Sequence, residues 1–190
     1  MGKPSGLDPK HAQCFNRATI DDHFCQLGEV LDAKGIPWAN VYNMDEKGCQ
    51  QGGGRKMQAI KYLIPCNRRP RYKLRSANLE LVTIIECVSA DGESLLPGFI
   101  FPGKEFHPEW YRTGYPDVSI GVSENGWTDN FLCEEWFHMV FIPQSKACNT
   151  SGAPILLILD GHGSHITKTM RQLATDNNIE LFCLLAHTTH

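Results

Sequence analysis

The stretch Ile155-Leu156-Leu157-Ile158-Leu159-Asp160-Gly161 sets the architecture that the sequence predicts. Five consecutive aliphatic residues are typical of a central strand covered on both faces, because a half-exposed strand would alternate apolar and polar residues. A helix is expected to begin at Thr167, and residues 179–185 have the pattern of a second strand. Strand, helix and strand in this order predict a right-handed parallel crossover. An acidic residue, Asp160, therefore stands where a central strand ends.

The residues before this crossover predict antiparallel strands. Strands are expected over residues 41–45, 79–88 and 95–101, and the Asp91-Gly92 step marks a hairpin turn between the last two. A short edge strand is also expected over residues 60–64. Consecutive strands joined by tight turns pair antiparallel, so three antiparallel strands should precede the parallel ones.

Two further helices complete the prediction. Residues 19–34 have one apolar face, made by Ile20, Phe24, Leu27 and Leu31, so they should form an amphipathic helix packed on the core. Lys34 and Gly35 should end this helix. Residues 129–141 have a broad apolar face, and Pro143 should end their helix. Residues 102–127 are expected to be a long connection, and connections of this length are usually functional or have structure of their own. The whole order predicts an α/β fold: a ribonuclease-H-like mixed sheet, three antiparallel strands and then parallel strands, with flanking helices.

Composition indicates one soluble globular domain. The chain has 190 residues, of which 42% are hydrophobic and 21% charged. The longest apolar runs are far too short to span a bilayer, and the first residues lack the apolar core of a signal peptide. The eight cysteines are scattered, without a C-x-x-C pair. This pattern argues against a zinc ribbon and a disulfide framework, and it predicts a reduced, intracellular protein without a membrane partner.

The net charge of −3 hides a basic segment. Residues 47–79 carry nine Lys or Arg and no acid, which leaves nine of the 18 basic residues, against all 21 acidic ones, for the rest of the chain. Such a segment either binds a phosphate backbone or forms a solvated hairpin, and the charges alone leave both interpretations open. The predicted nucleic-acid-binding residues in this segment are Arg55, Lys56, Arg68, Arg69, Arg71, Lys73 and Arg75.

Two aspartates are the candidate catalytic residues and metal ligands. Asp45 is expected at the end of the first strand, before a glycine-rich stretch, and Asp160 at the end of the central strand. If the two strands are neighbours, both carboxylates point into one cleft at the edge of the sheet, where they could hold a pair of Mg²⁺ ions. The alternative is that each aspartate only terminates a strand and caps a turn. Their joint placement in this strand order favours the metal site.

Four histidines near the predicted cleft allow another interpretation. His162, His165, His187 and His190 form two His-x-x-His pairs. We expect them to donate hydrogen bonds near the acidic cleft or to contact phosphate, rather than to form a zinc site. A metal-dependent phosphohydrolase acting on a small molecule remains a third functional class beside a nuclease and a nucleic-acid-binding module.

Four blocks of sequence carry a family resemblance. Together they resemble the catalytic core of the pogo/Tigger group of DDE transposases, in the DDE endonuclease superfamily that also includes centromere protein B-like proteins. The likeness covers about residues 36–190, which we predict to form the core, whereas residues 1–35 are a lead-in and an amphipathic helix. The four blocks are Asn43-Met44-Asp45-Glu46-Lys47-Gly48, Glu86-Cys87-Val88-Ser89-Ala90-Asp91-Gly92, Leu157-Ile158-Leu159-Asp160-Gly161-His162-Gly163-Ser164-His165 and His187-Thr188-Thr189-His190.

The resemblance implies cleavage and joining of DNA phosphodiesters in the nucleus by three acidic residues with Mg²⁺ or Mn²⁺. Asp45 matches the first acid and Asp160 the second. The family's third acid lies a few residues past the His-Thr-Thr-His block, and the sequence stops on that block. We therefore expect this chain to be inactive as it stands, with a partner or a second copy covering the incomplete C-terminal face. The alternative is a domesticated or decayed remnant that binds nucleic acid without catalysis.

Overall fold

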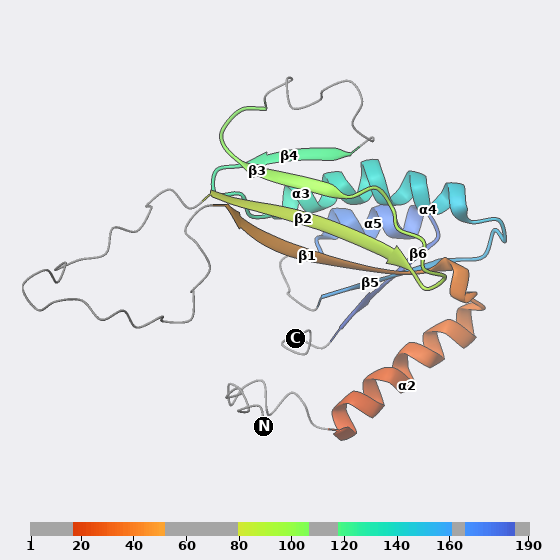
Figure 1. Ribbon diagram of the computed structural model, residues 1–190. Helices are drawn as coiled ribbons and strands as arrows, with labels where there is room; N and C mark the ends of the chain where they lie inside the picture. The colour runs from red at the N-terminus through yellow and green to blue at the C-terminus, as the bar shows by residue number, and fades with distance from the viewer. Residues whose placement is uncertain (1–16, 52–79, 107–117, 161–165, 185–190) are drawn as a thin grey trace, which may run out of the picture.

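A mixed six-stranded sheet forms the centre of the computed structural model, which describes residues 17–51, 80–106, 118–160 and 166–184 (Figure 1). The strand order is β4-β3-β2-β1-β5-β6. The strands are β1 (Val41–Gln51), β2 (Glu80–Ser89), β3 (Gly98–Pro102), β4 (Ser119–Ser123), β5 (Ile155–Leu159) and β6 (Ile179–Cys183). The helices are α2 (Arg17–Lys34), the 3₁₀ turn η1 (Trp38–Asn40), α3 (Asn130–Trp136), the π-helical turn η4 (Phe137–Phe141), α4 (Ile142–Cys148) and α5 (Lys168–Asp176).

The strand pairings confirm the predicted fold class. Strands β1, β2 and β3 pair antiparallel, whereas β5 pairs parallel with both β1 and β6. Helix α5 connects β5 to β6, which gives the predicted crossover. Thr167 caps this helix, because its side chain accepts a hydrogen bond from the Met170 amide. This mixed sheet with helices on its faces is the ribonuclease-H-like layout.

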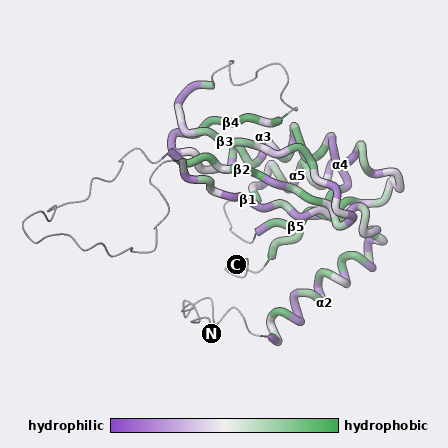
Figure 2. Tube along the Cα trace, in the orientation of Figure 1, coloured by the Kyte–Doolittle hydropathy of each residue, from purple (hydrophilic) through white to green (hydrophobic). Residues whose placement is uncertain are grey.

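Helices cover the two faces of the sheet unequally. The main core lies between one face and α3, η4, α4 and α5, where Phe137, Phe141 and Leu157 are fully buried. On the other face, Leu27 of α2 packs against Val41 and Leu156. Figure 2 shows hydrophilic and hydrophobic residues mixed along α2, as expected for a helix with one buried face. None of the helices in the described ranges is long and apolar enough to cross a membrane.

The first strand is longer than the sequence predicted. It does not end near Asp45 but continues to Gln51, because β2 pairs with it all the way to the Gln51–Glu80 pair. Gly48 lies inside this ladder, where an added Cβ would approach Leu81 Cδ1 to 3.3 Å. Asp45 is therefore inside a strand, and the expectation that it marks the strand's end was wrong.

The helix that should have ended at Pro143 continues past it. The Ile142 amide donates to the Phe137 carbonyl, five residues back, so the chain makes one wide π-helical turn just before the proline. Pro143 then lies in the first turn of α4, where its missing N–H costs little. The helix begins after Asp129, whose side chain accepts a hydrogen bond of 2.8 Å from the Leu132 amide.

Two other features differ from the sequence prediction. The connection over residues 102–127 has structure of its own, as the prediction allowed, but its strand β4, which pairs parallel with β3 at the edge of the sheet, was not identified. In α2, Phe24 was expected to face the core, but 59% of its surface is exposed.

Gly35, with φ of 62°, ends α2 as predicted. The strand expected over residues 60–64 lies outside the described residues.

Candidate acidic site at the edge of β5

Asp45 and Asp160 lie on neighbouring strands. Asp160 directly follows β5, and Asn43 of β1 pairs with Ile158 of β5 in the parallel register. Continuing this register by two residues brings Asp45 level with Asp160. The pairing itself ends at Asn43 and Ile158, so the two aspartates lie just beyond the last paired residues of β1 and β5.

Both aspartates belong to the same face of the sheet. Side chains along a strand alternate between faces, so positions four residues apart share one. Asp45 follows Val41 by four residues and Asp160 follows Leu156 by four, and both of these apolar residues pack under α2. The sheet thus brings together two carboxylates that are far apart in the sequence.

The surroundings of the two carboxylates differ. Asp45 is exposed, and its Oδ1 atom accepts a hydrogen bond of 2.8 Å from the Glu46 amide. Asp160 is partly buried, and its Oδ1 atom is buried without a hydrogen-bond partner in the part of the chain that the structure describes. A buried carboxylate oxygen normally has a partner, so this atom is suited to a ligand.

The carboxylates of Asp45 and Asp160 are of the ligand type that a hard divalent cation prefers, but two side chains are fewer ligands than such a cation needs. Carboxylate oxygens are the ligands that Mg²⁺ and Mn²⁺ prefer. Within the described ranges, no group of three or more His, Cys, Asp and Glu side chains is arranged to hold a metal ion. Asp45 and Asp160 therefore form part of a possible donor set, with room for further ligands.

A third carboxylate that the sequence reasoning missed lies beside this pair. Glu86 of β2 is the direct cross-strand partner of Asp45, and both residues are exposed. Asp160, Asp45 and Glu86 thus form a row across β5, β1 and β2. The sequence could have placed Glu86 opposite Asp45 only if the register between the predicted first and second strands had been known.

Most of the other candidate residues lie outside the described residues. This applies to the predicted nucleic-acid-binding residues Arg55, Lys56, Arg68, Arg69, Arg71, Lys73 and Arg75, and to His162, His165, His187 and His190. Lys47, at the start of the basic segment, is described and is exposed on β1.

The described cysteines are free thiols. Burial raises the pKa of Cys87 to about 12, and burial is also the main reason why the pKa of Cys133 rises to about 12. Burial raises the pKa of Cys183 as well; the Arg171 charge opposes this rise, and the Asp160 charge adds to it. These three thiols stay protonated at neutral pH, so they are poor metal ligands and poor nucleophiles.

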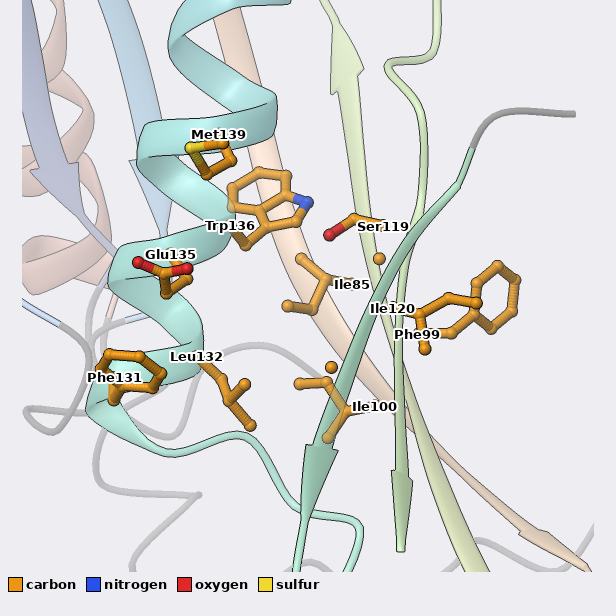
Figure 3. A pocket seen from close by; sticks show the side chains of 12 residues that line it. Ile85, Phe99, Ile100, Ser119, Ile120, Phe131, Leu132, Glu135, Trp136 and Met139 are labelled. Carbon is orange, nitrogen blue, oxygen red and sulfur yellow. The ribbon is translucent and has the colours of Figure 1, made fainter. Parts of the chain in front are cut away.

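An apolar pocket of about 130 Å³ lies away from the acidic site, between the α3–η4 helix and strands β3 and β4 (Figure 3). Ile85, Ile100 and Trp136 line it, and they belong to the core on the helix-covered face. Among the described residues that line this pocket, Glu135 is the only ionisable one.

A second, polar groove of about 500 Å³ lies between α5 and β6. Lys34 and Glu180 form an ion pair of 2.7 Å at its wall, and Arg171 also lines it. The Lys34 charge is thus already paired. Neither hollow contains Asp45 or Asp160.

Comparisons with known proteins identify the family and the fold of this chain. Residues 78–190 match the family model described as DDE superfamily endonuclease. The chain is also 35% identical over 154 residues to a protein named MFS-type transporter clz9 from Cochliobolus lunatus. That match covers 80% of this chain but 16% of the relative, so the chain corresponds to a small part of that protein's length.

Two solved structures show the same fold. The Mos1 mariner paired end complex with Mn has a TM-score of 0.55 and 10% identity, over 99% of this chain and 49% of the solved chain. The Mos1 strand transfer complex has a TM-score of 0.51 and 10% identity, over 99% of this chain and 48% of the solved chain. The chain thus spans about half the length of the Mos1 chains. By the match of its residues 78–190, this chain belongs to the DDE superfamily endonucleases.

Proposed function

We propose that this chain is the catalytic core of a DDE-type endonuclease or transposase that cuts and joins DNA phosphodiesters. One observation carries the proposal: Asp45 and Asp160 stand level on neighbouring strands and share one face of the sheet. Membership of the DDE superfamily endonucleases supports the same chemistry. The structural neighbours include Mos1 complexes with a transposon end, with Mn and with Mg.

In this proposal Asp45 and Asp160 are two of the carboxylates that hold Mg²⁺ or Mn²⁺. Bound ions of this kind activate a water or a 3′-hydroxyl and stabilise the leaving oxygen of an in-line displacement. The chain's own contribution is to fix the carboxylates. Just before Asp45, β1 pairs with β2 on one side and with β5 on the other, and Asp160 directly follows the last residue of β5. The sheet therefore holds the backbone next to both aspartates.

Metal binding by the pair can be measured without catalysis. Adding Mn²⁺ should raise the melting temperature of the chain, because an ion that binds only the folded state stabilises it. Asp45→Asn and Asp160→Asn should each reduce this shift strongly. Asp91→Asn is the matched control, since Asp91 is an exposed aspartate in the β2–β3 turn. An equal Mn²⁺ shift in all three variants would contradict the assignment of Asp45 and Asp160.

Catalysis is tested with supercoiled plasmid and Mn²⁺. Because no third acid is assigned in this chain, we expect nicking by the unmodified chain to be weak or absent; any nicking that occurs should persist in Asp91→Asn and be lost in Asp45→Asn and Asp160→Asn. Nicking that survives in both of these site variants would show that a different site, or a contaminating nuclease, cuts the DNA.

A second candidate function is nucleic-acid binding without catalysis. The charge of residues 47–79, nine basic residues and no acid, favours it independently of the carboxylates. In this case DNA retardation in a gel should persist in Asp45→Asn and Asp160→Asn and weaken steeply with salt, while no nicking occurs. Hydrolysis of a small phosphate ester without DNA binding would contradict both candidates.

A further inference from the structure

Strand β4 is a border strand of the sheet and carries no charged side chain. It pairs parallel with β3 on one side, and among the described residues it has no strand on the other side. Its five residues include neither a charge nor a proline. The border strand at the opposite edge, β6, carries Glu180, which forms an ion pair with Lys34. Border strands usually carry a charge or a proline that hinders pairing with another chain, so β4 departs from the usual pattern.

The hydrogen bonds of β4 show which of its backbone groups point to the open side. The Ser119 amide donates to the residue before β3 at 3.2 Å, and the Ser123 carbonyl accepts from the residue after β3 at 2.8 Å. Both serines therefore bond toward β3. In a parallel ladder alternate residues bond to the same neighbour, so Ile120 and Val122 direct their N–H and C=O groups to the open side. An extended segment can pair with these groups.

The helix beside β4 presents two large apolar side chains at the rim of the 130 Å³ pocket. Phe131 and Met139 are each 65% exposed, and they line this pocket together with Ser119 and Gly121 of β4 (Figure 3). The helix lies close against the strand, since a Cβ added to Gly121 would lie 2.9 Å from Leu132 Cδ2. A volume near 130 Å³ is close to that of a cavity that holds benzene. The pocket can therefore take one apolar side chain from a strand added beside β4.

The pocket also contains a hydrogen-bond donor without an acceptor. Trp136 is 3% exposed, and its Nε1 atom is buried without a hydrogen-bond partner in the part of the chain that the structure describes. Figure 3 shows this nitrogen on the side of the indole that faces Ser119 and the strands. A buried N–H group normally has an acceptor. An occupant with an oxygen near this position would supply the acceptor, which is independent support for a bound group.

Glu135 decides between two possible occupants. It is exposed, lines the pocket and lies midway between Phe131 and Met139 on the helix, four residues from each. A second copy of this chain, pairing through its own β4, would bring a second Glu135 to the same edge, and like charges repel. Its Ser119 and Gly121 would also be too small to fill the pocket. A different chain with a basic residue at this place is complementary in charge.

We propose that β4 and the α3–η4 helix bind an extended segment of another protein, which pairs with β4 as an added strand. The inward face of this segment has two large apolar side chains with a Lys or Arg between them. The spacing fits, because the eight residues from Phe131 to Met139 rise about 12 Å and four residues of a strand span about 13 Å. The apolar side chains then contact Phe131 and Met139, and the basic one pairs with Glu135. This surface does not include Asp45 or Asp160, so the inference is independent of the proposed function.

The probe is the labelled peptide Thr-Phe-Thr-Lys-Thr-Leu-Thr, whose Phe, Lys and Leu share one face of a strand. Its affinity for the chain is measured by fluorescence anisotropy at low salt. Glu135→Lys should weaken binding on the order of 10-fold, and replacing the lysine of the peptide by glutamate should restore it. Phe131→Ala should weaken binding on the order of 10-fold as well. Phe24→Ala is the matched control, because Phe24 is 59% exposed but lies on α2.

Strand pairing itself is tested at Ile120. A border strand tolerates proline where the missing N–H faces solvent, so Ile120→Pro should keep the β3–β4 pairing and lose peptide binding. In the unmodified chain, the peptide should slow amide hydrogen exchange at Ile120 and Val122, measured by NMR. This readout does not depend on the folding of any variant, and melting temperatures show which variants are folded.

Three results would overturn the inference. The first is a peptide that does not bind the unmodified chain, and the second is peptide binding that is unchanged in both Glu135→Lys and Ile120→Pro. The third is a dimer of the unmodified chain that dissociates in Ile120→Pro, measured by analytical ultracentrifugation, because a second copy would then occupy β4.

Discussion

Asp45 of β1 and Glu86 of β2 are direct partners in the antiparallel ladder, and both are exposed acids. Two like charges placed opposite each other destabilise a sheet, and cross-strand pairs of this kind change stability by about 0.2–1 kcal/mol. A sequence selected only for stability would avoid this pairing. Local conflicts of this sort are often found at functional sites, which is consistent with the proposed role of Asp45.

Removing the Glu86 charge should therefore stabilise the chain. Glu86→Gln is expected to raise the free energy of unfolding by a few tenths of a kcal/mol up to about 1 kcal/mol, measured by urea denaturation at low salt. The gain should shrink at high salt, because exposed charges are screened. Glu93→Gln, at an exposed acid in the β2–β3 turn, should change stability less. A loss of stability in Glu86→Gln would contradict this account of the pair.

Two glycines with positive φ should respond differently to alanine. At Gly92, with φ of 90°, an added Cβ meets nothing within 4 Å, so Gly92→Ala should cost only the backbone strain of about 1 kcal/mol. At Gly126 the added Cβ also collides with the Leu81 carbonyl, so Gly126→Ala should cost several times more. The measurement is urea denaturation of both variants. Equal costs would show that the turn before Trp127 moves away from β2 easily.

Asn40 ties the start of β1 to the loop that precedes β5. This residue is 2% exposed, and its amide nitrogen lies 3.1 Å from Asn149 Oδ1 and 3.1 Å from the Pro154 carbonyl oxygen. Asn40→Ala would remove the donor to the Pro154 carbonyl, whereas Asn149 Oδ1 keeps its hydrogen bonds from Ser151 and Gly152. We therefore expect a loss of about 1–3 kcal/mol in the free energy of unfolding. Asn43→Ala, at an exposed position of the same strand, should have a much smaller effect. If Asn40→Ala is as stable as Asn43→Ala, the buried network does not fix β1 against β5.

The thiols should divide into two classes of reactivity. With a pKa of about 12, Cys87 and Cys133 are ionised to only about one part in ten thousand at pH 8. Iodoacetamide at pH 8 should therefore label the exposed Cys25 and Cys148 in the native chain and reach Cys87 and Cys133 only after unfolding. Mass spectrometry of peptides gives the labelled positions. Labelling of Cys133 at the rate of Cys25 would contradict its burial.

The same pKa shifts predict a loss of stability at alkaline pH. Cys87 and Cys133 ionise near pH 9 in the unfolded chain but only near pH 12 in the folded one. The unfolded state therefore loses protons first, and the free energy of unfolding should fall as pH rises from about 9 to 12. The double variant Cys87→Ala, Cys133→Ala should show a shallower fall, measured by urea denaturation at several pH values.

The sequence predicted those parts of the fold that depend on local patterns. The aliphatic run of β5, the capping Thr167 of α5 and the terminating Gly35 of α2 are signals within a few residues, and each was confirmed. The sequence also predicted that the strands carrying Asp45 and Asp160 are neighbours, and β1 and β5 do pair.

The parts that were mispredicted depend on partners distant in sequence. Residues 47–51 extend β1 because β2 pairs with them, despite the glycine among them. Strand β4 forms beside β3, although its sequence has only a short apolar pattern. The helix passes Pro143 because a wider turn precedes it, and no short motif announces that turn. Glu86 was missed for a related reason, since only the register brings it opposite Asp45.

Strand β1 is longer than β5, so the two halves of β1 have different neighbours. Up to Asn43, β1 is an interior strand with neighbours on both sides; beyond it, β5 supplies no further pairs and β1 borders the sheet on that side. A border strand is where another chain could add itself and start aggregation, and a charged lysine is a common protection against this. Lys47 is exposed in that bordering half. We therefore expect its charge to discourage copies of the chain from pairing along this part of β1.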